Sequence, residues 1–368
     1  MPAMTLQQVF ELALQHHQAG RLAEAETLYR QILAVEPRHP DSLHLLGVIC
    51  SQAGRDDLAA DLIGRAIAIA PWQAAYHSNL GNALRALGRL HEATAAYRRA
   101  VQLQPDFGDA HNNLGSALKD AGEVNGAIVA FQRAIQCRAD RAEFHANLAG
   151  ALRDRGRLAD AEAAYRQALA FRPDLAEAWH GLGIVLNESG RRGEVIAAFG
   201  RALQFRPESA DFSTDLGNAL CMDGRVDEAN AAYQRAIGCA PNHAPAHLGL
   251  GHALNLQGRF DEAMAASRAA ADLSPHSAVA HSNFGFALIR LGRLDEGIAS
   301  YRRAVELQPD IAEIHANLSN ALRNRGRTDE AVAASRRAIE LRPDYAVAWS
   351  NLANALKDSG RMPEAVEA

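Results

Sequence analysis

The sequence is poor in aromatic residues, cysteines and long apolar runs, and each shortage excludes a class of protein. Phe, Trp and Tyr make up 6% of its 368 residues. No apolar stretch approaches the roughly 20 residues that a membrane-spanning helix needs, and the N-terminal residues lack the basic segment and apolar core of a secretory signal. No C-x-x-C pair occurs among the four cysteines, Cys50, Cys137, Cys221 and Cys239. We therefore expect a cytoplasmic protein with free thiols and no membrane partner.

An excess of positive charge and the motifs of catalysis are also missing. Lys and Arg number 38 against 43 Asp and Glu, so the formal net charge is -5 and no basic field recruits nucleic acid. The sequence contains no phosphate-binding loop, no G-x-S-x-G and no H-E-x-x-H. We predict that this chain is not an enzyme and that it holds no cofactor or metal.

What the sequence does have is a single period of 34 residues. Glycine recurs at this spacing without a gap, at residues 20, 54, 88, 122, 156, 190, 224, 258, 292, 326 and 360. Proline recurs at 37, 71, 105, 173, 207, 241, 275, 309 and 343, and Ala139 fills the one missing place. No insertion interrupts this register, so we predict one array over residues 1–368. Its units begin near residues 6, 40, 74, 108, 142, 176, 210, 244, 278, 312 and 346, the last one truncated.

Each unit has the pattern of two helices, as the third unit shows. Its first helix places one face at the spacing i, i+3, i+4, i+7 with His77, Leu80, Gly81 and Leu84. Gly88 ends this helix, because glycine adopts the left-handed conformation of a helix C-terminus without steric cost. The second helix carries Ala93, Tyr97 and Ala100 on one face. One such pair cannot bury its apolar faces alone, so successive pairs must stack.

The sequence resembles the tetratricopeptide repeat over nearly the whole chain. The resemblance rests on Leu-Gly in the first helix, on Ala followed by Tyr or Phe and then Ala in the second helix, and on proline every 34 residues. The resemblance implies an all-α fold, a right-handed α-α superhelix of about eleven helix-turn-helix repeats. It also implies that the first helices line a concave groove that binds proteins. The pentatricopeptide readers of RNA have a 35-residue period, and the strict phase of 34 excludes them.

Asparagine recurs on the first helices although it is a poor helix former. We number each unit from its first residue, which is Ala74 in the third unit. Position 6 holds Asn79, Asn113, Asn147, Asn283, Asn317 and Asn351. Position 9 holds Asn82, Asn218, Asn320 and Asn354, and it faces the same way as position 6. Neighbouring helices pack about 8–10 Å apart and an extended chain rises about 3.3 Å per residue, so these amides would meet a bound peptide backbone about every third residue.

We call these ten asparagines the asparagine ladder, and two interpretations of it stay open. The amides either bind extended peptide segments, or they solvate the groove and cap neighbouring helices. The repeats that read S-N-L-G-N-A-L resemble the repeat region of the O-linked N-acetylglucosamine transferases, and this resemblance implies that the position 6 asparagines hold substrate segments. The main hypothesis is a scaffold that binds proteins or extended peptides. The alternative is the substrate-recognition arm of such a glycosyltransferase, whose catalytic region is not in this chain.

Three residues interrupt the ladder, namely Gly181, Asp215 and Gly249 at position 6. We expect any selectivity to reside near this break. The histidines at position 4 are expected to be helix-packing residues, because Trp179 and Trp349 replace them in two units and their spacing is too wide to share an ion. These histidines are His77, His111, His145, His247, His281 and His315.

Arginine follows the turn glycine in most units, as at Arg55 and Arg89. These side chains are expected at solvated loop tips, with a weak basic strip for an acidic partner as the alternative. In the last unit the second helix is incomplete. We therefore expect Leu352 and Leu356 to keep partly exposed faces and to offer a site of self-association.

Overall fold

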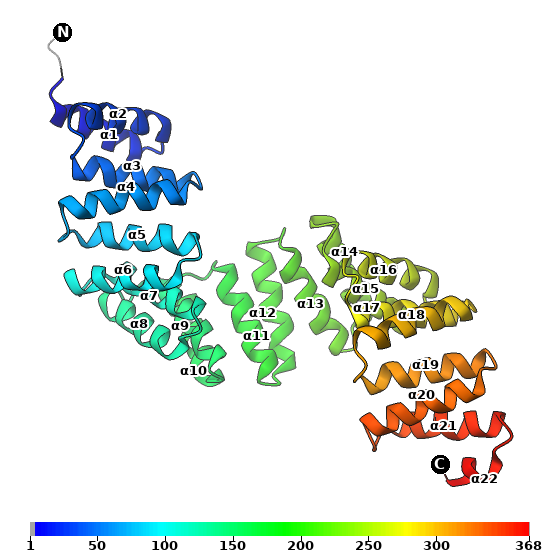
Figure 1. The fold of residues 1–368 in the computed structure, drawn as a ribbon. Coiled ribbons are helices and arrows are strands. Elements are labelled where there is room, and N and C mark those ends of the chain that lie inside the picture. The colour runs from blue at the N-terminus through cyan, green and yellow to red at the C-terminus, as the bar shows by residue number, and fades with distance from the viewer. Residues whose placement is uncertain (1–3, 368) are drawn as a thin grey trace. The chain divides into compact units, whose positions relative to one another are not determined.

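The computed structural model describes residues 4–367, and within that range helices are joined by short turns (Figure 1). The chain divides into two compact units, residues 1–189 and 190–368, which are described separately. The first unit contains α1 (Leu6–Gln18), α2 (Leu22–Val35), α3 (Pro40–Gln52), α4 (Asp56–Ile69), α5 (Ala74–Ala86), α6 (Leu90–Leu103), α7 (Gly108–Asp120), α8 (Val124–Cys137), α9 (Ala142–Asp154), α10 (Leu158–Phe171) and α11 (Ala176–Glu188).

The second unit contains α12 (Arg192–Phe205), α13 (Ala210–Met222), α14 (Val226–Cys239), α15 (Ala244–Leu256), α16 (Phe260–Leu273), α17 (Ala278–Arg290), α18 (Leu294–Leu307), α19 (Ala312–Asn324), α20 (Thr328–Leu341), α21 (Ala346–Asp358) and α22 (Met362–Glu367). Residues 4–367 contain no strand, so the expected all-α class is confirmed. None of the described helices has the length and apolar character needed to cross a membrane.

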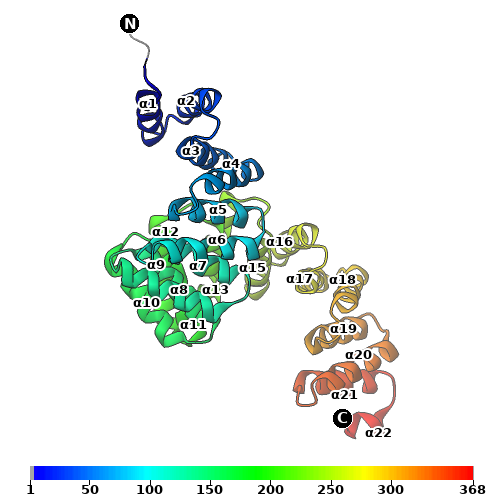
Figure 2. The ribbon, with the colours of Figure 1, turned by 60° about the vertical axis from the view of Figure 1, so that its left-hand side comes forward.

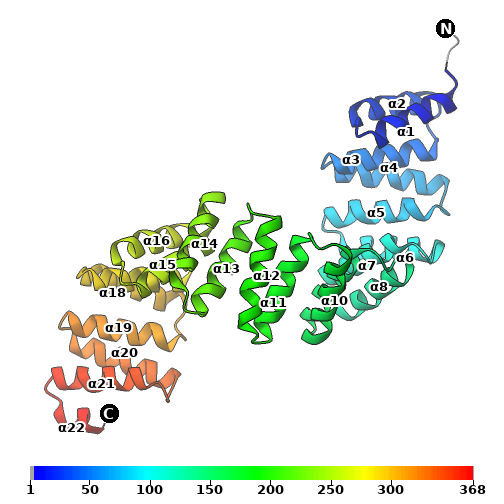
Figure 3. The same ribbon diagram turned by 180° about the vertical axis from the view of Figure 1, so that it is seen from behind.

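Odd-numbered helices, the A helices, are the first helices of each repeat, and even-numbered helices, the B helices, are the second. Each helix packs against the next one in both units, and the order of α18 to α22 can be followed in Figure 2 and Figure 3. The A helices also contact one another in order, from α3 to α11 in the first unit and from α13 to α21 in the second. The predicted solenoid of helix pairs is therefore present in each unit.

The turn between the A and B helices has one geometry throughout. All eleven turn glycines lie at positive φ, between 71° and 82°, where a side chain would be strained. In the third repeat the N–H of Gly88 donates to the carbonyl of Arg85, and the N–H of Arg89 donates to the carbonyl of Leu84, 2.9 Å away. These two bonds form a Schellman motif, which satisfies the last carbonyls of the A helix.

An aromatic side chain of the B helix packs onto the A helix where that helix has a glycine. Tyr97 is 1% exposed, and a Cβ atom added at Gly81 would lie 2.6 Å from its ring. Ala93 and Ala100 are fully buried on either side. The pattern of small and aromatic residues therefore sets how closely the two helices of a repeat approach each other.

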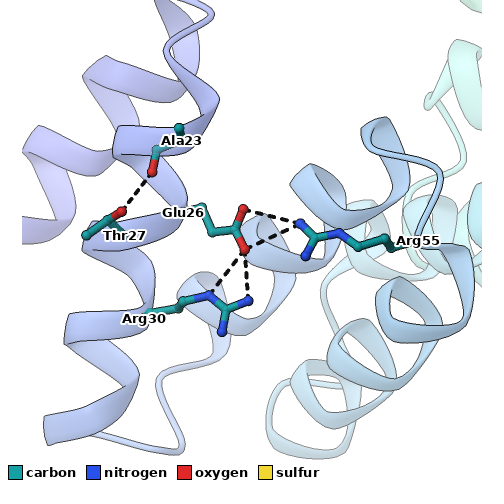
Figure 4. Close-up of polar contacts among 5 residues, drawn as sticks. All are labelled: Ala23, Glu26, Thr27, Arg30 and Arg55. Carbon is teal, nitrogen blue, oxygen red and sulfur yellow. Dashed lines mark hydrogen bonds and ion pairs between the residues drawn. The ribbon is translucent and has the colours of Figure 1, made fainter.

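Most B helices follow an arginine that pairs with an acidic side chain three residues later. Arg89 donates to Glu92 through two nitrogens, at 2.8 and 2.7 Å, and both side chains are about half exposed. In the first two repeats Glu26 accepts hydrogen bonds from Arg30 and from Arg55 of the next repeat (Figure 4). Each such exposed pair contributes at most about 1 kcal/mol. The arginines thus lie at solvated turns, as expected, and most of them have carboxylate partners there.

The expectation for the C-terminal repeat was wrong. Leu352 and Leu356 are only 6% and 2% exposed. The short helix α22 packs against α21, and Ala365 contacts the apolar cluster that contains both leucines. The exposed apolar side chains of this repeat are instead Val347, Trp349, Met362 and Val366. Self-association through this repeat stays a prediction and loses the leucine faces as its basis.

Candidate functional site

The ten predicted asparagines all lie on A helices. Those at position 6 are half-buried, namely Asn79, Asn113, Asn147, Asn283, Asn317 and Asn351. At position 9, Asn82, Asn218 and Asn320 are exposed and Asn354 is half-buried. Positions 6 and 9 are separated by one helical turn, so both rows lie on the same face of their helices. The two units differ in what these amides bind.

In the first unit the amides bond one another across neighbouring helices. Asn79 donates to Nε2 of His44 on α3 at 2.8 Å, and its own oxygen accepts from Asn82 at 3.3 Å. The oxygen of Asn82 accepts from Asn113 of α7 at 3.1 Å and from the hydroxyl of Tyr97 at 2.7 Å. One connected string of hydrogen bonds therefore joins α3, α5, α6 and α7.

The next A helix continues this arrangement with a different partner. Asn147 on α9 donates to Oδ1 of Asn112 on α7 at 2.9 Å. Asn112 occupies position 5, the position that His44 occupies in its own repeat. Each position 6 amide of the first unit thus donates to the preceding A helix. A ligand that takes the bonded N–H of such an amide must first displace an internal bond, so that contact gains little net free energy.

In the second unit more of the described asparagine side chains lack an internal hydrogen bond. Asn351 donates to the backbone carbonyl of Ala316 at 3.0 Å, and its oxygen accepts no hydrogen bond from the described residues. Among residues 4–367, the amides of Asn283, Asn317 and Asn354 have no hydrogen-bond partner. The oxygen of Asn218 accepts from Tyr233 at 2.8 Å. Asn283, Asn317 and Asn351 lie on α17, α19 and α21, which contact one another in order.

The glycines that interrupt the ladder are positions of tight packing. A Cβ atom at Gly181 would lie 2.3 Å from the ring of Tyr165, which belongs to the preceding B helix. A Cβ atom at Gly249 would lie 2.4 Å from the ring of Tyr233. Because a tyrosine ring fills the space in which asparagine would project, these two positions cannot carry an amide without moving that ring. The third interrupting residue, Asp215 on α13, is half-buried.

A pocket of about 320 Å³ lies on the same face of the first unit. Its lining includes Asn147 and the charged side chains of Arg85, Lys119 and Asp120. These charges are paired across repeats, since Arg85 contacts Asp120 at 2.6 Å and Lys119 contacts Asp154 at 3.2 Å. The face of the first unit is therefore polar, and its cations already have carboxylate partners.

The position 4 side chains share one hydrogen bond, which explains why histidine and tryptophan interchange there. Nε2 of His77 lies 2.9 Å from the carbonyl oxygen of Pro71, six residues earlier. Nε1 of Trp179 donates to the carbonyl of Pro173 at 2.8 Å, also six residues earlier. The same bond forms at His111, His145, His247, His281, His315 and Trp349. The packing role expected of the histidines is confirmed, and the bond assigns the Nε2–H tautomer.

Sequence reasoning missed the partners of the asparagines. His44, Asn112, Tyr97 and Tyr233 hold amides of the first or second unit in place. One signal was available. Where position 9 is asparagine and position 24 of the same repeat is tyrosine, the two residues are 15 apart and the hydroxyl reaches the amide.

Replacing Asn82 by alanine should lower the free energy of unfolding by about 1–4 kcal/mol. The substitution removes three hydrogen bonds, each worth roughly 0.5–1.5 kcal/mol net, and it gains up to about 0.7 kcal/mol of helix propensity. Asn320→Ala is the matched control, since position 24 of that repeat is Ser335 and only Arg323 bonds the amide. Urea unfolding should show no loss for the control. Equal stability of the two variants would contradict a structural role for Asn82.

Comparison with known proteins supports the fold. Two of the solved structures that match have very low sequence identity and a TM-score above 0.5. The APC/C hetero-tetramer Cut9–Hcn1 is 14% identical, with 95% of this chain and 76% of that chain covered and a TM-score of 0.55. The Pseudomonas aeruginosa pilF structure is 18% identical, with 56% and 94% covered and a TM-score of 0.51. YrrB, described as a TPR protein with an unusual peptide-binding site, is 27% identical over 49% of this chain and 93% of its own, with a TM-score of 0.44. No curated protein matches the sequence.

Family models match most of the chain. A model described as a TPR repeat matches residues 81–122 and 149–190. A model described as a tetratricopeptide repeat matches 181–244, 214–278, 284–346 and 317–368, and another with this description matches 16–82. With the helix pairs, the 34-residue period and these matches together, the chain belongs to the tetratricopeptide repeat family.

Proposed function

We propose that this protein is a scaffold that binds extended segments of other proteins, and that Asn283, Asn317 and Asn351 of the second unit hold the segment. The observation that carries this proposal is the state of the three amides. They occupy the same position on three A helices that contact one another in order. The side-chain amides of Asn283 and Asn317 have no hydrogen bond among the described residues, and Asn351 keeps an open oxygen.

The chemistry of these amides fits a peptide backbone. A carboxamide offers donors and an acceptor, the same groups that a peptide unit presents. Helices that pack about 8–10 Å apart place successive amides about three residues apart along an extended chain. Such contacts bind backbone rather than side chains, so the site tolerates many sequences. In the first unit each position 6 amide already donates one hydrogen bond, whereas Asn283 and Asn317 of the second unit donate none to the described residues, which favours the second unit as the place of binding.

The test uses linear 12-residue peptides selected from a random display library against the full chain. We expect the triple variant Asn283→Ala, Asn317→Ala, Asn351→Ala to lose tenfold or more in affinity for these peptides, which corresponds to about 1.4 kcal/mol. The melting temperature should stay level or rise, because alanine favours helix. The matched control is the triple variant Asn79→Ala, Asn113→Ala, Asn147→Ala, which makes the same substitutions at position 6 of the first unit and should change affinity less than threefold.

A second measurement examines whether the backbone is what the amides bind. N-methylation of the selected peptide, one residue at a time, removes one backbone donor in each version. We expect affinity to fall at positions about three residues apart. If methylation has no periodic effect and the second-unit triple variant binds as well as the wild type, the proposal is wrong.

A further inference from the structure

Three side chains at position 13 form a row on the second unit that differs from the rest of the array. Met222 on α13 and Leu256 on α15 are 56% and 60% exposed, and Arg290 on α17 is also exposed. Position 13 lies seven residues after position 6, so it faces the same way as the asparagines. The three helices contact one another in order. The row therefore presents two apolar side chains and one cation beside the amides.

Arg290 is held in place without a carboxylate. Its guanidinium carbon lies 4.4 Å from the centre of the Phe260 ring and 5.8 Å from that of Phe286. Those two rings are 6.3 Å apart. No acidic side chain of the described residues lies within ion-pair distance of Arg290. Stacking uses the flat face of the guanidinium and leaves its in-plane N–H groups available to a carboxylate.

Other cations on the A helices are arranged differently. Arg85 is paired with Asp120 at 2.6 Å, and Lys119 is paired with Asp154 at 3.2 Å. Each of these carboxylates occupies position 13 of the repeat that follows its cation. At position 13 the first unit thus has carboxylates that are paired with cations. At the same position the second unit has two exposed apolar side chains, Met222 and Leu256, followed by Arg290, a cation without a carboxylate partner among the described residues.

We propose that the row of Met222, Leu256 and Arg290 selects the segments that bind, an inference that rests on the proposed function. Its preferred partner is an extended protein segment with two apolar side chains and one acidic side chain, each three residues from the next. The spacing follows from A helices about 8–10 Å apart and an extended rise of about 3.3 Å per residue. The two apolar side chains cover Met222 and Leu256, and the carboxylate pairs with Arg290.

The test uses two fluorescently labelled peptides, GSLSSLSSESG and its reversed sequence, because the segment runs in one of two directions. Anisotropy should show that one of them binds the full chain. Changing its glutamate to lysine should weaken binding tenfold or more. The variant Arg290→Glu should reverse the preference for glutamate over lysine. Met222→Gln or Leu256→Gln should weaken the binding of the glutamate and lysine versions alike, by at least threefold. Arg302→Glu on the B helix α18 is the control and should change affinity less than twofold.

The outcomes separate this inference from the function on which it rests. The inference is overturned if neither peptide binds, or if Arg290→Glu leaves the preference for glutamate over lysine unchanged. In that case the function still stands if display-selected peptides lose affinity in the Asn283, Asn317 and Asn351 triple variant. The inference is supported directly if Arg290→Glu switches the preference from the glutamate peptide to the lysine peptide. A loss of folding would instead weaken the binding of both of these peptides alike.

Discussion

Replacing His44 by asparagine should remove about 3 kcal/mol of acid sensitivity from the first unit. His44 is 7% exposed, and burial lowers its pKa from 6.5 to about 4, with the carboxylate of Asp41 opposing this shift and His17 adding to it. Tyr76 stacks on the ring at 4.3 Å. Nε2 accepts a hydrogen bond from Asn79, so a proton on this nitrogen would break that bond.

The sign of the effect follows from which state binds the proton. Between pH 6.5 and pH 4 the unfolded chain protonates His44 and the folded chain does not, so the free energy of unfolding falls as the pH falls through this window. The stabilisation is complete above pH 6.5. A shift of this size corresponds to about 3 kcal/mol.

The chain itself supplies the replacement. Asn112 occupies the same position two repeats later and accepts the equivalent bond from Asn147 at 2.9 Å. Urea unfolding of the wild type and His44→Asn at pH 7 and pH 4 should show a smaller loss in the variant. Carboxylates titrate in both proteins, so their contribution cancels in the comparison. Parallel losses in the two proteins would show that His44 protonates freely in the folded state.

Replacing Gly181 by alanine should destabilise the first unit by about 1–3 kcal/mol, the usual cost of overpacking a core. The new Cβ atom would lie 2.3 Å from the ring of Tyr165, which is 6% exposed and has little room to move. Gly64, inside α4 of the same unit, has no atom within 4 Å of its Cβ position. Gly64→Ala should therefore stabilise by about 0.5–1 kcal/mol through helix propensity.

The two alanine variants should move the urea midpoint in opposite directions. This contrast removes any general effect of adding a methyl group to a helix. If Gly181→Ala is as stable as Gly64→Ala, the Tyr165 ring rotates away at little cost. Gly181 would then be an open gap in the ladder rather than a packed contact.

The fold could be predicted because its causes are local and repeated. A glycine at each A–B turn and small residues opposite Tyr97 act within one repeat or between adjacent repeats. The placement of the asparagines on A helices followed from the same period. The end of the array could not be predicted in this way, since the burial of Leu352 and Leu356 depends on six residues of α22 that pack without completing a repeat.

The state of each amide could not be predicted from its position. Asn79 and Asn317 occupy the same place in their repeats, yet one bonds to His44 and the other has no partner among the described residues. The difference arises from the preceding A helix, which offers histidine in one case and serine, Ser282, in the other. The resemblance to the O-linked N-acetylglucosamine transferases stays a prediction.

The uniform turn geometry has a consequence for how such a gene changes length. Because all eleven turn glycines fall within 71° to 82° in φ, the chain passes from the A helix to the B helix in the same way in every repeat. Unequal crossing-over that removes or duplicates 34 codons, at any phase, therefore joins two segments whose backbones already match. The product gains or loses one pair of helices at a time. Under the proposed function, recombination would adjust the length of bound segment in steps of about three residues, without first finding a new fold.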